Sequence, residues 1–163
     1  MFLAREVKTI EAISAVVFRQ ILVAVDDSDP SRQALAVGLS LARRYEGNLI
    51  LCHVVSSVNV FTRAETNDYD TSGGGLLASA AEQAKVAQVE CTVRLLHGEP
   101  IEQLLQVAGD TQADLIVIGT HGRKGLARVY VGSVAEGILR RSSVPVLVVR
   151  APSAQGAYEE PSA

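Results

Sequence analysis

Residues 20–55, QILVAVDDSDPSRQALAVGLSLARRYEGNLILCHVV, contain the pattern that decides the fold. Two short runs of mostly branched apolar residues, Ile21–Val25 and Asn48–Val55, enclose a stretch in which apolar residues recur at helical spacing. Both runs are continuous rather than alternating, which is typical of strands buried on both faces. Asp29 and Pro30 supply an N-cap and a first helical residue. The stretch therefore predicts a strand, a helix and a second strand.

The same alternation continues toward the C-terminus. Further strands are expected at Cys91–Leu96, Asp114–Ile118 and Val144–Val149, and further helices at about Leu76–Gln88, Pro100–Ala108 and Val131–Arg141. Strands joined by helices of this length run parallel through right-handed crossovers. We therefore expect an α/β domain with a doubly wound, five-stranded parallel sheet in the order 3-2-1-4-5 and helices on both faces. Ligands of such sheets bind at the carboxyl ends of the strands where the winding reverses, beside the first strand.

Composition restricts the class of protein. The 163 residues, 48% hydrophobic and 20% charged, are typical of one globular domain with its own core. A net charge of −3 excludes a generally basic protein that coats nucleic acid or an anionic membrane. Cys52 and Cys91 show no CxxC spacing, which argues against a disulfide scaffold or a zinc site and favours the reducing cytoplasm. The apolar run Ile13–Phe18 is too short to cross a membrane.

Three segments fall outside the repeating pattern. The single domain is expected at 18–151, preceded by a leader at 1–17 and followed by a polar, proline-containing tail at 152–163 that reads as disordered. The leader is either a short amphipathic helix or a loosely packed extension. The stretch Val55–Gly75 is long for a connection and predicts a loop, with Gly73–Gly75 as a linker. Such a loop is either a lid over a site or a surface insertion.

The clearest functional motif follows the fourth expected strand. Gly119-Thr120-His121-Gly122 is followed, after nine residues, by Gly132-Ser133 at the start of the last expected helix. Glycines let the main chain approach a phosphate closely, and a helix N-terminus presents unpaired N–H groups and the positive end of its dipole. His121 either contacts a phosphate or lines the turn. The motif indicates an anion site, and the alternative is a glycine-rich loop used only for tight turning.

The charges of the same region support an anion. Between residues 118 and 150 one acidic residue, Glu136, stands against six basic ones: Arg123, Lys124, Arg128, Arg140, Arg141 and Arg150. This acidic protein therefore has a locally cationic segment. The commoner nucleotide loops G-x-x-x-x-G-K-[ST] and G-x-G-x-x-G are absent from the expected places.

Asp26 ends the first expected strand, beside the reversal of the winding. A carboxylate there can accept hydrogen bonds from ribose hydroxyls. We interpret Asp29 as a helix cap and Asp27 as a solvent-facing residue. His53 and His97, within and at the end of strands, are more readily explained as structural residues than as metal ligands, and we predict no metal site in the protein itself.

The segments ILVAVDDSDPSRQAL, NLILCHVV, HGEPIEQLL and ADLIVIGTHG, with the Gly132-Ser133 helix and VPVLVV, resemble the universal stress protein family over about residues 17–150. The resemblance points to the ATP-binding branch of that family and implies an adenine nucleotide alpha hydrolase-like fold. It also implies a homodimer paired through the last strand, Val144–Val149, and Pro145 suits an edge position there. The leader and the tail are not explained by the family pattern.

The resemblance further implies a role for each motif residue. Asp26 would meet the ribose, the main chain of Val54 would pair with the adenine edge, and Ala24 and Val25 would wall the base. ATP, or another adenine nucleotide, would carry Mg²⁺ or Mn²⁺ bridging its phosphates. The phosphates would be held by Gly119, Gly122, Gly132, Ser133 and Val134, and the expected binding set also includes Ile118, His121 and Arg123.

The sequence offers no clear group to position or deprotonate water for ATP hydrolysis, so we expect at most slow hydrolysis or autophosphorylation. The preferred function is a nucleotide-dependent regulator or sensor in a stress response, read by an unidentified protein partner. Two alternatives stay open. One is a weak ATPase or autophosphorylating protein, and the other is a dimeric scaffold with a vestigial nucleotide loop.

Overall fold

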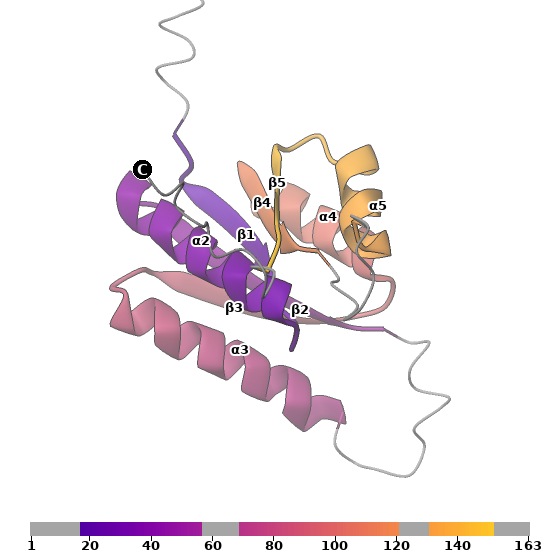
Figure 1. Cartoon of the computed structure of the whole chain (residues 1–163), viewed down its shortest axis with the longest axis horizontal. Coiled ribbons are helices and arrows are strands. Elements are labelled where there is room, and N and C mark those ends of the chain that lie inside the picture. Colours follow the sequence, from indigo (N-terminus) through magenta and orange to yellow (C-terminus); the bar gives the residue numbers. More distant parts are fainter. Residues whose placement is uncertain (1–16, 57–68, 121–130, 152–163) are drawn as a thin grey trace, which may run out of the picture.

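The computed structural model describes residues 17–56, 69–120 and 131–151. These residues form one sheet of parallel strands connected by helices (Figure 1). The expected leader and tail, the middle of the expected Val55–Gly75 loop, and His121, Gly122 and Arg123 lie outside the described residues.

The sheet has the order β3-β2-β1-β4-β5, and every pairing in it is parallel, as the alternation of strands and helices predicts. Because β1 pairs with β2 on one side and β4 on the other, the winding reverses beside β1. Strand bounds differ from the expected ones by two residues at most. The strands are β1 (Gln20–Ala24), β2 (Asn48–Val55), β3 (Cys91–His97), β4 (Leu115–Gly119) and β5 (Val146–Val149).

Burial separates the central strands from the edges. The middle residues of β1, β2 and β4 are buried on both faces, as expected for continuous apolar runs. The expectation was wrong for the two edge strands, since β3 exposes Thr92 and Val93 and β5 exposes Leu147. An edge strand has one neighbour and less helix above it, so apolar composition alone does not bury it.

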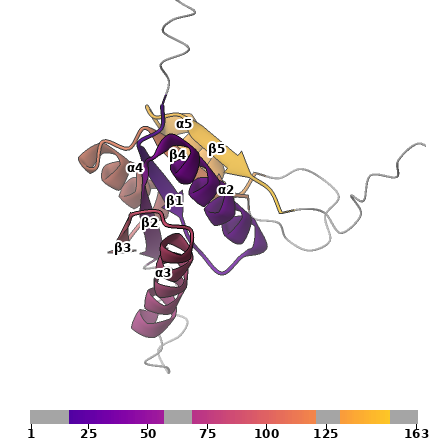
Figure 2. The ribbon, with the colours of Figure 1, turned by 90° about the vertical axis from the view of Figure 1, so that its left-hand side faces the viewer.

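Four helices cover the described sheet, two on each face (Figure 2). α2 (Asp29–Tyr45) and α3 (Tyr69–Val86) contribute to the core cluster on one face. α4 (Pro100–Asp110) and α5 (Ser133–Arg141) contribute to the cluster on the other. Side chains of β1 alternate between the clusters, with Ile21 in the first and Leu22 in the second, so both faces of the sheet are buried.

The start of α2 differs from the expectation by one residue. Ser28, in extended conformation with φ −81° and ψ 154°, is the N-cap, and its Oγ accepts a hydrogen bond from the backbone N–H of Ser31 at 3.3 Å. Asp29 is the first helical residue, and its carboxylate pairs with Arg32 one turn later. The interpretation of Asp29 as the cap was therefore wrong, because two cap-forming residues stand side by side and only the backbone decides between them.

α3 begins earlier than expected and includes Gly73, Gly74 and Gly75, which were expected to be a linker. A Cβ on Gly73 would lie 2.8 Å from Cδ2 of His53 and 3.0 Å from Cδ1 of Leu95. The absent side chain thus lets the helix lie directly against β2 and β3. Tertiary packing outweighs the low helix propensity of glycine here, which is why the sequence pattern misplaced the helix start.

Candidate functional site

A cavity of about 300 Å³ opens at the carboxyl ends of β1, β2 and β4, beside the reversal of the winding. Its position agrees with the general rule for open parallel sheets, and its volume falls at the lower end of small-molecule sites, about 300–1,000 Å³. The N-terminal ends of three helices also reach it, through Ser31 of α2, Pro100 of α4 and Val134 of α5.

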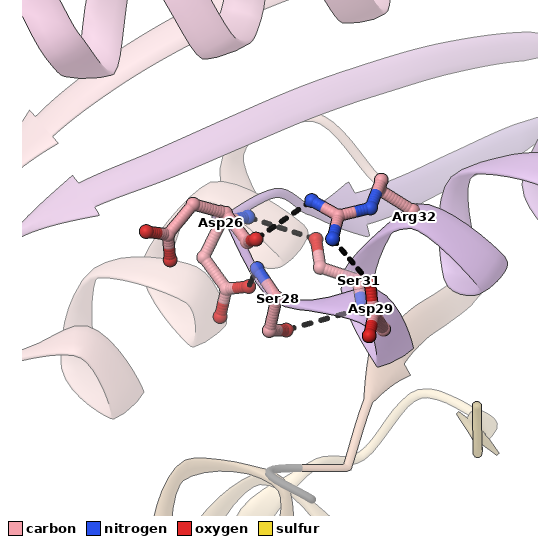
Figure 3. A network of polar contacts seen from close by, with 6 residues as sticks. Asp26, Ser28, Asp29, Ser31 and Arg32 are labelled. Carbon is pink, nitrogen blue, oxygen red and sulfur yellow. Dashed lines mark hydrogen bonds and ion pairs between the residues drawn. The ribbon is translucent and has the colours of Figure 1, made fainter. Parts of the chain in front are cut away.

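Asp26 is held at the cavity wall by its own neighbours (Figure 3). Its Oδ1 accepts a hydrogen bond from the backbone N–H of Ser28 at 2.8 Å, and its backbone N–H donates to Oγ of Ser31, also at 2.8 Å. The carboxylate accepts bonds at two oxygens, so lone pairs remain after the Ser28 contact. A half-buried carboxylate with acceptor positions that the described residues leave open is suited to bind hydroxyl donors. Asp27, as expected, is exposed.

The end of β2 forms a second wall. The backbone N–H of Val25 donates to the carbonyl of Cys52 at 2.7 Å, and Nδ1 of His53 lies 2.7 Å from the carbonyl of Val25. Because a carbonyl can only accept, Nδ1 carries a proton in this contact. His53 therefore has the structural role expected of it and lines the cavity as well.

Cys52 adds a thiol to this wall. Burial raises the pKa of Cys52 from an ordinary 9.0 to about 12, and the positive charge of Arg94, a smaller effect, lowers it. The thiol is consequently neutral at physiological pH and behaves as a small apolar group. The wall of the cavity formed by Cys52, Val54 and Leu104 is apolar apart from backbone groups.

The opposite side of the cavity consists of backbone from β4 and α5. Gly119 ends β4, and a Cβ there would lie 2.5 Å from the carbonyl carbon of Pro30 and 2.7 Å from the nitrogen of Ser31. Its lack of a side chain thus serves packing against α2 in addition to any ligand. Gly132 is the N-cap of α5 and makes no side-chain cap, so the first N–H groups of the helix are without intrahelical partners at the cavity.

Two of the six basic residues counted toward an anion site lie elsewhere. Arg140 and Arg141 are in the last turn of α5, which is nine residues long, and this places them roughly 11–12 Å from the helix start. Arg140 pairs with Glu136 at 2.8 Å, and Arg141 pairs with Glu102 of α4 at 2.7 Å. Their expected contribution to the anion site was wrong, because α5 starts at the cavity and its last turn, which carries both residues, lies away from it.

The structure brings most of the expected binding residues together. Those that line the cavity are Ala24, Val25, Asp26, Val54, Ile118, Gly119, Gly132 and Val134. Ser133 is the exposed first residue of α5, next to the lining residues Gly132 and Val134. His121, Gly122 and Arg123 lie outside the described residues, so their expected roles remain predictions.

Sequence reasoning missed about half of the lining. The further lining residues are Asp27, Ser31, Cys52, His53, Pro100, Leu104 and Ala135. The parallel topology contains a usable signal, because the last residues of each central strand and the first turn of each following helix share one edge. Applied to β2 and α4, that rule indicates His53 and Pro100. Cys52 falls within a strand that was expected to be buried, and no pattern in the sequence distinguishes Ser31.

The described residues contain neither a metal-binding cluster nor a membrane-spanning helix. No three His, Cys, Asp or Glu side chains there gather closely enough to hold a metal ion. In the same part of the chain, no helix combines the length and the apolar character needed to cross a membrane.

Comparison with known proteins agrees with the fold and the motifs. The model of the universal stress protein family matches residues 18–150. Universal stress protein YxiE of Bacillus subtilis (strain 168) is 31% identical over 147 residues, which are 82% of this chain and 99% of the relative.

Solved structures are also similar. The structure of hypothetical protein MJ0577 superposes with a TM-score of 0.75 at 24% identity over 85% of this chain and 100% of its own. A universal stress protein solved in complex with cAMP is 25% identical, with a TM-score of 0.64, over 84% of this chain and 100% of its own. The sheet order and these neighbours define an adenine nucleotide alpha hydrolase-like fold. The chain belongs to the universal stress protein family.

Proposed function

We propose that this chain binds an adenine nucleotide, ATP in the first place, in the cavity at the carboxyl ends of β1, β2 and β4. One observation carries the proposal: Asp26, Val54, Gly119 and Gly132, distant in the sequence, line a single cavity of about 300 Å³. A carboxylate, an apolar wall with free backbone groups and a helix N-terminus match the three parts of a nucleotide.

The base and the ribose would occupy the side formed by β1 and β2. Val54 would offer its main chain to the adenine edge, while Ala24 and Val25 would contact the ring. The free acceptor positions of Asp26, whose Oδ1 is already oriented by the N–H of Ser28 at 2.8 Å, would receive the ribose hydroxyls. Hydrogen bonds to an ionised carboxylate are stronger than neutral ones, so Asp26 should contribute much of the affinity.

The phosphates would lie at the start of α5. Its first N–H groups have no intrahelical partner, Gly132 brings no side chain between them and the cavity, and the adjacent Ser133 adds a hydroxyl. Gly119 and Val134 complete this side, together with Gly122 and Arg123 from the segment that is not described. Mg²⁺ or Mn²⁺ would arrive with the phosphates and neutralise part of their charge.

A related structure supports the class of ligand. The universal stress protein solved with cAMP has 25% identity to this chain and covers 84% of it. We extend its adenine nucleotide class to the present cavity and propose that nucleotide occupancy regulates what this protein binds. Of the two acidic residues that line the described cavity, Asp26 is assigned to the ribose and Asp27 is exposed, and fast turnover is not part of the proposal.

We also propose that β5 pairs with β5 of a second copy. β5 is an edge strand of the sheet, and its Leu147 is 37% exposed. Pairing would satisfy the free backbone groups along this edge and cover the apolar side chain. Light scattering after size-exclusion chromatography should give a dimer for the wild type and a monomer for Leu147→Lys.

The first test is to denature the purified protein and identify any released nucleotide by mass spectrometry, and then to titrate the emptied protein with ATP, AMP, cAMP and GTP. We expect an adenine nucleotide near one per chain, and loss of binding in Gly132→Asp, which places a carboxylate against the phosphates. Glu136→Asp, on an exposed part of α5, is the matched control. An emptied wild-type protein that binds none of the four nucleotides would leave the scaffold as the better function.

A further inference from the structure

Ser31 presents a buried hydroxyl at the proposed nucleotide site. Ser31 is 3% exposed. In the described part of the chain, Ser31 and Thr120 are the buried polar residues. Buried hydroxyls are costly unless both their donor and acceptor capacities are used. Both capacities of the Ser31 hydroxyl are used at the junction between the end of β1 and the first turn of α2.

The partners of Ser31 form a closed set of hydrogen bonds around Asp26 (Figure 3). Oγ of Ser31 accepts from the backbone N–H of Asp26 at 2.8 Å and donates to the carbonyl of Ala24 at 3.4 Å. The N–H of Ser31 donates to Oγ of Ser28 at 3.3 Å, and the N–H of Ser28 donates to Oδ1 of Asp26 at 2.8 Å. Both the backbone and the carboxylate of Asp26 are therefore fixed through Ser31 and Ser28.

The same residue is fixed from the other side of the cavity. A Cβ on Gly119 would lie 2.7 Å from the nitrogen of Ser31, so β4 packs directly on the backbone that carries the hydroxyl. Ser31 cannot shift toward β4, and its Oγ stays within reach of Asp26. This preorganisation reduces the conformational freedom that Asp26 would otherwise lose when a ligand binds.

We propose that Ser31 is a positioning residue that, through Asp26, sets the preference of the site for nucleotides with free ribose hydroxyls. The inference rests on the proposed function. A residue that only stabilises the fold would change the affinities for all nucleotides alike. A positioning residue changes the ratio between the affinity for a nucleotide with ribose hydroxyls and the affinity for one without them. A ligand without ribose hydroxyls makes no bond to Asp26 and is indifferent to the orientation of that carboxylate.

The test compares ATP with 2′,3′-dideoxy-ATP by isothermal titration calorimetry, in the wild type, Ser31→Ala, Asp26→Ala and the double variant. Bonds to a charged group predict that the wild type prefers ATP by at least about 10-fold. Ser31→Ala should lower this ratio several-fold while changing the affinity for the dideoxy nucleotide less than about twofold. In the Asp26→Ala background, Ser31→Ala should add no further loss, because coupled residues are not additive.

Two results would overturn the inference: an unchanged ratio in Ser31→Ala, whether or not both affinities fall together, or additive losses in the double variant. A wild type that binds neither nucleotide overturns the proposed function itself, whereas binding with an unchanged ratio overturns the role of Ser31 alone. If Ser31→Ala does not fold, Ser31→Cys keeps the size of the side chain with a weaker acceptor, and the same ratio decides.

Discussion

α2 and α3 cover the same face of the sheet, yet they begin in different ways. α2 starts from the cap Ser28, with Pro30 and Ser31 buried in its first turn and Gly119 packed against them. The first half of α3 includes three consecutive glycines, and Gly74 and Gly75 have no atom within 4 Å of a built Cβ. Local contacts thus fix the start of α2, whereas α3 is held mainly by its later turns.

The difference follows the position of the cavity. Ser31 in the first turn of α2 lines it, and the hydrogen bonds that orient Asp26 are made with Ser31 and with the N-cap Ser28. α3 contacts the cavity wall indirectly, because its Gly73 packs on the ring of His53 and His53 lines the cavity. We therefore expect the α2 side of the molecule to be rigid and the first turns of α3 to open at a lower free energy.

The two cysteines compare the cavity wall with the edge strand β3 that α3 covers, and here we expect the largest effect. Cys52 lines the cavity, whereas Cys91 is half-buried against the core cluster that includes Leu77 of α3. Because the pKa of Cys52 is raised to about 12, only about one molecule in 10⁴ is a thiolate at pH 8. Iodoacetamide followed by mass spectrometry should modify Cys91 at least about 100-fold faster than Cys52.

The variants Cys52→Ala and Cys91→Ala assign the two rates. In 6 M guanidinium the rates should become similar, since burial, the main cause of the raised pKa of both thiols, is lost on unfolding. Equal rates in the native protein would mean that the cavity wall opens as readily as the edge of the sheet at β3, and the comparison would then fail.

A side chain at Gly119 should disturb the fixed start of α2. In Gly119→Ala the new Cβ would lie 2.5 Å from the carbonyl carbon of Pro30. This distance is too short for a van der Waals contact, so the backbone of β4 or of α2 must shift. Overpacking of this kind lowers the free energy of unfolding by about 1–3 kcal/mol. Urea denaturation followed by circular dichroism measures the loss.

The matched control is Gly109→Ala, in α4, where a Cβ would meet nothing within 4 Å. That substitution should stabilise the protein by up to about 1 kcal/mol, because alanine favours the helix. If Gly119→Ala proved no more harmful than Gly109→Ala, the proposed rigidity at the junction of β4 and α2 would be wrong.

Loss of the cap should have a smaller effect on the same helix. Ser28→Ala removes the acceptor for the N–H of Ser31 and should cost about 1 kcal/mol of unfolding free energy. Ser28→Gly should cost only a few tenths. Ser79→Ala, at an exposed position of α3, is expected to be neutral or slightly stabilising. A cost in Ser79→Ala as large as that in Ser28→Ala would indicate that the two helices depend equally on local polar groups.

The sequence predicted the sheet because its signals are local. Ile21–Val25 and Asn48–Val55 are apolar runs joined by one clear helix, and parallel order follows from the connection. Placement of Asp26 and Gly132 near the reversal followed from the same topology, and both line the cavity. Such predictions need only the order of the elements.

What the sequence did not predict depends on contacts between distant residues. Gly73–Gly75 was expected to be a linker because it follows no strand, and the close approach of His53 and Leu95 to Gly73 depends on contacts that the sequence does not show. Likewise, the buried Ser31 has an ordinary helical position in the sequence. Its significance appears once the end of β1 is seen beside it.

The smallest expected effect concerns the start of α3. Gly74→Ala and Gly75→Ala place a methyl group in open space and should each stabilise the protein by about 0.5–1 kcal/mol, through helix propensity and a less flexible unfolded chain. Hydrogen exchange of the amides around residues 73–77 should slow in both variants.

Gly73→Ala separates propensity from packing at the same helix start. Its Cβ would lie 2.8 Å from Cδ2 of His53, and this ring is held by the contact between Nδ1 and the carbonyl of Val25 at 2.7 Å. The gain in propensity should therefore be cancelled or reversed, and the strain should reach the cavity wall. A Gly73→Ala protein as stable as Gly74→Ala would show that His53 yields easily, and the start of α3 would then be independent of the site.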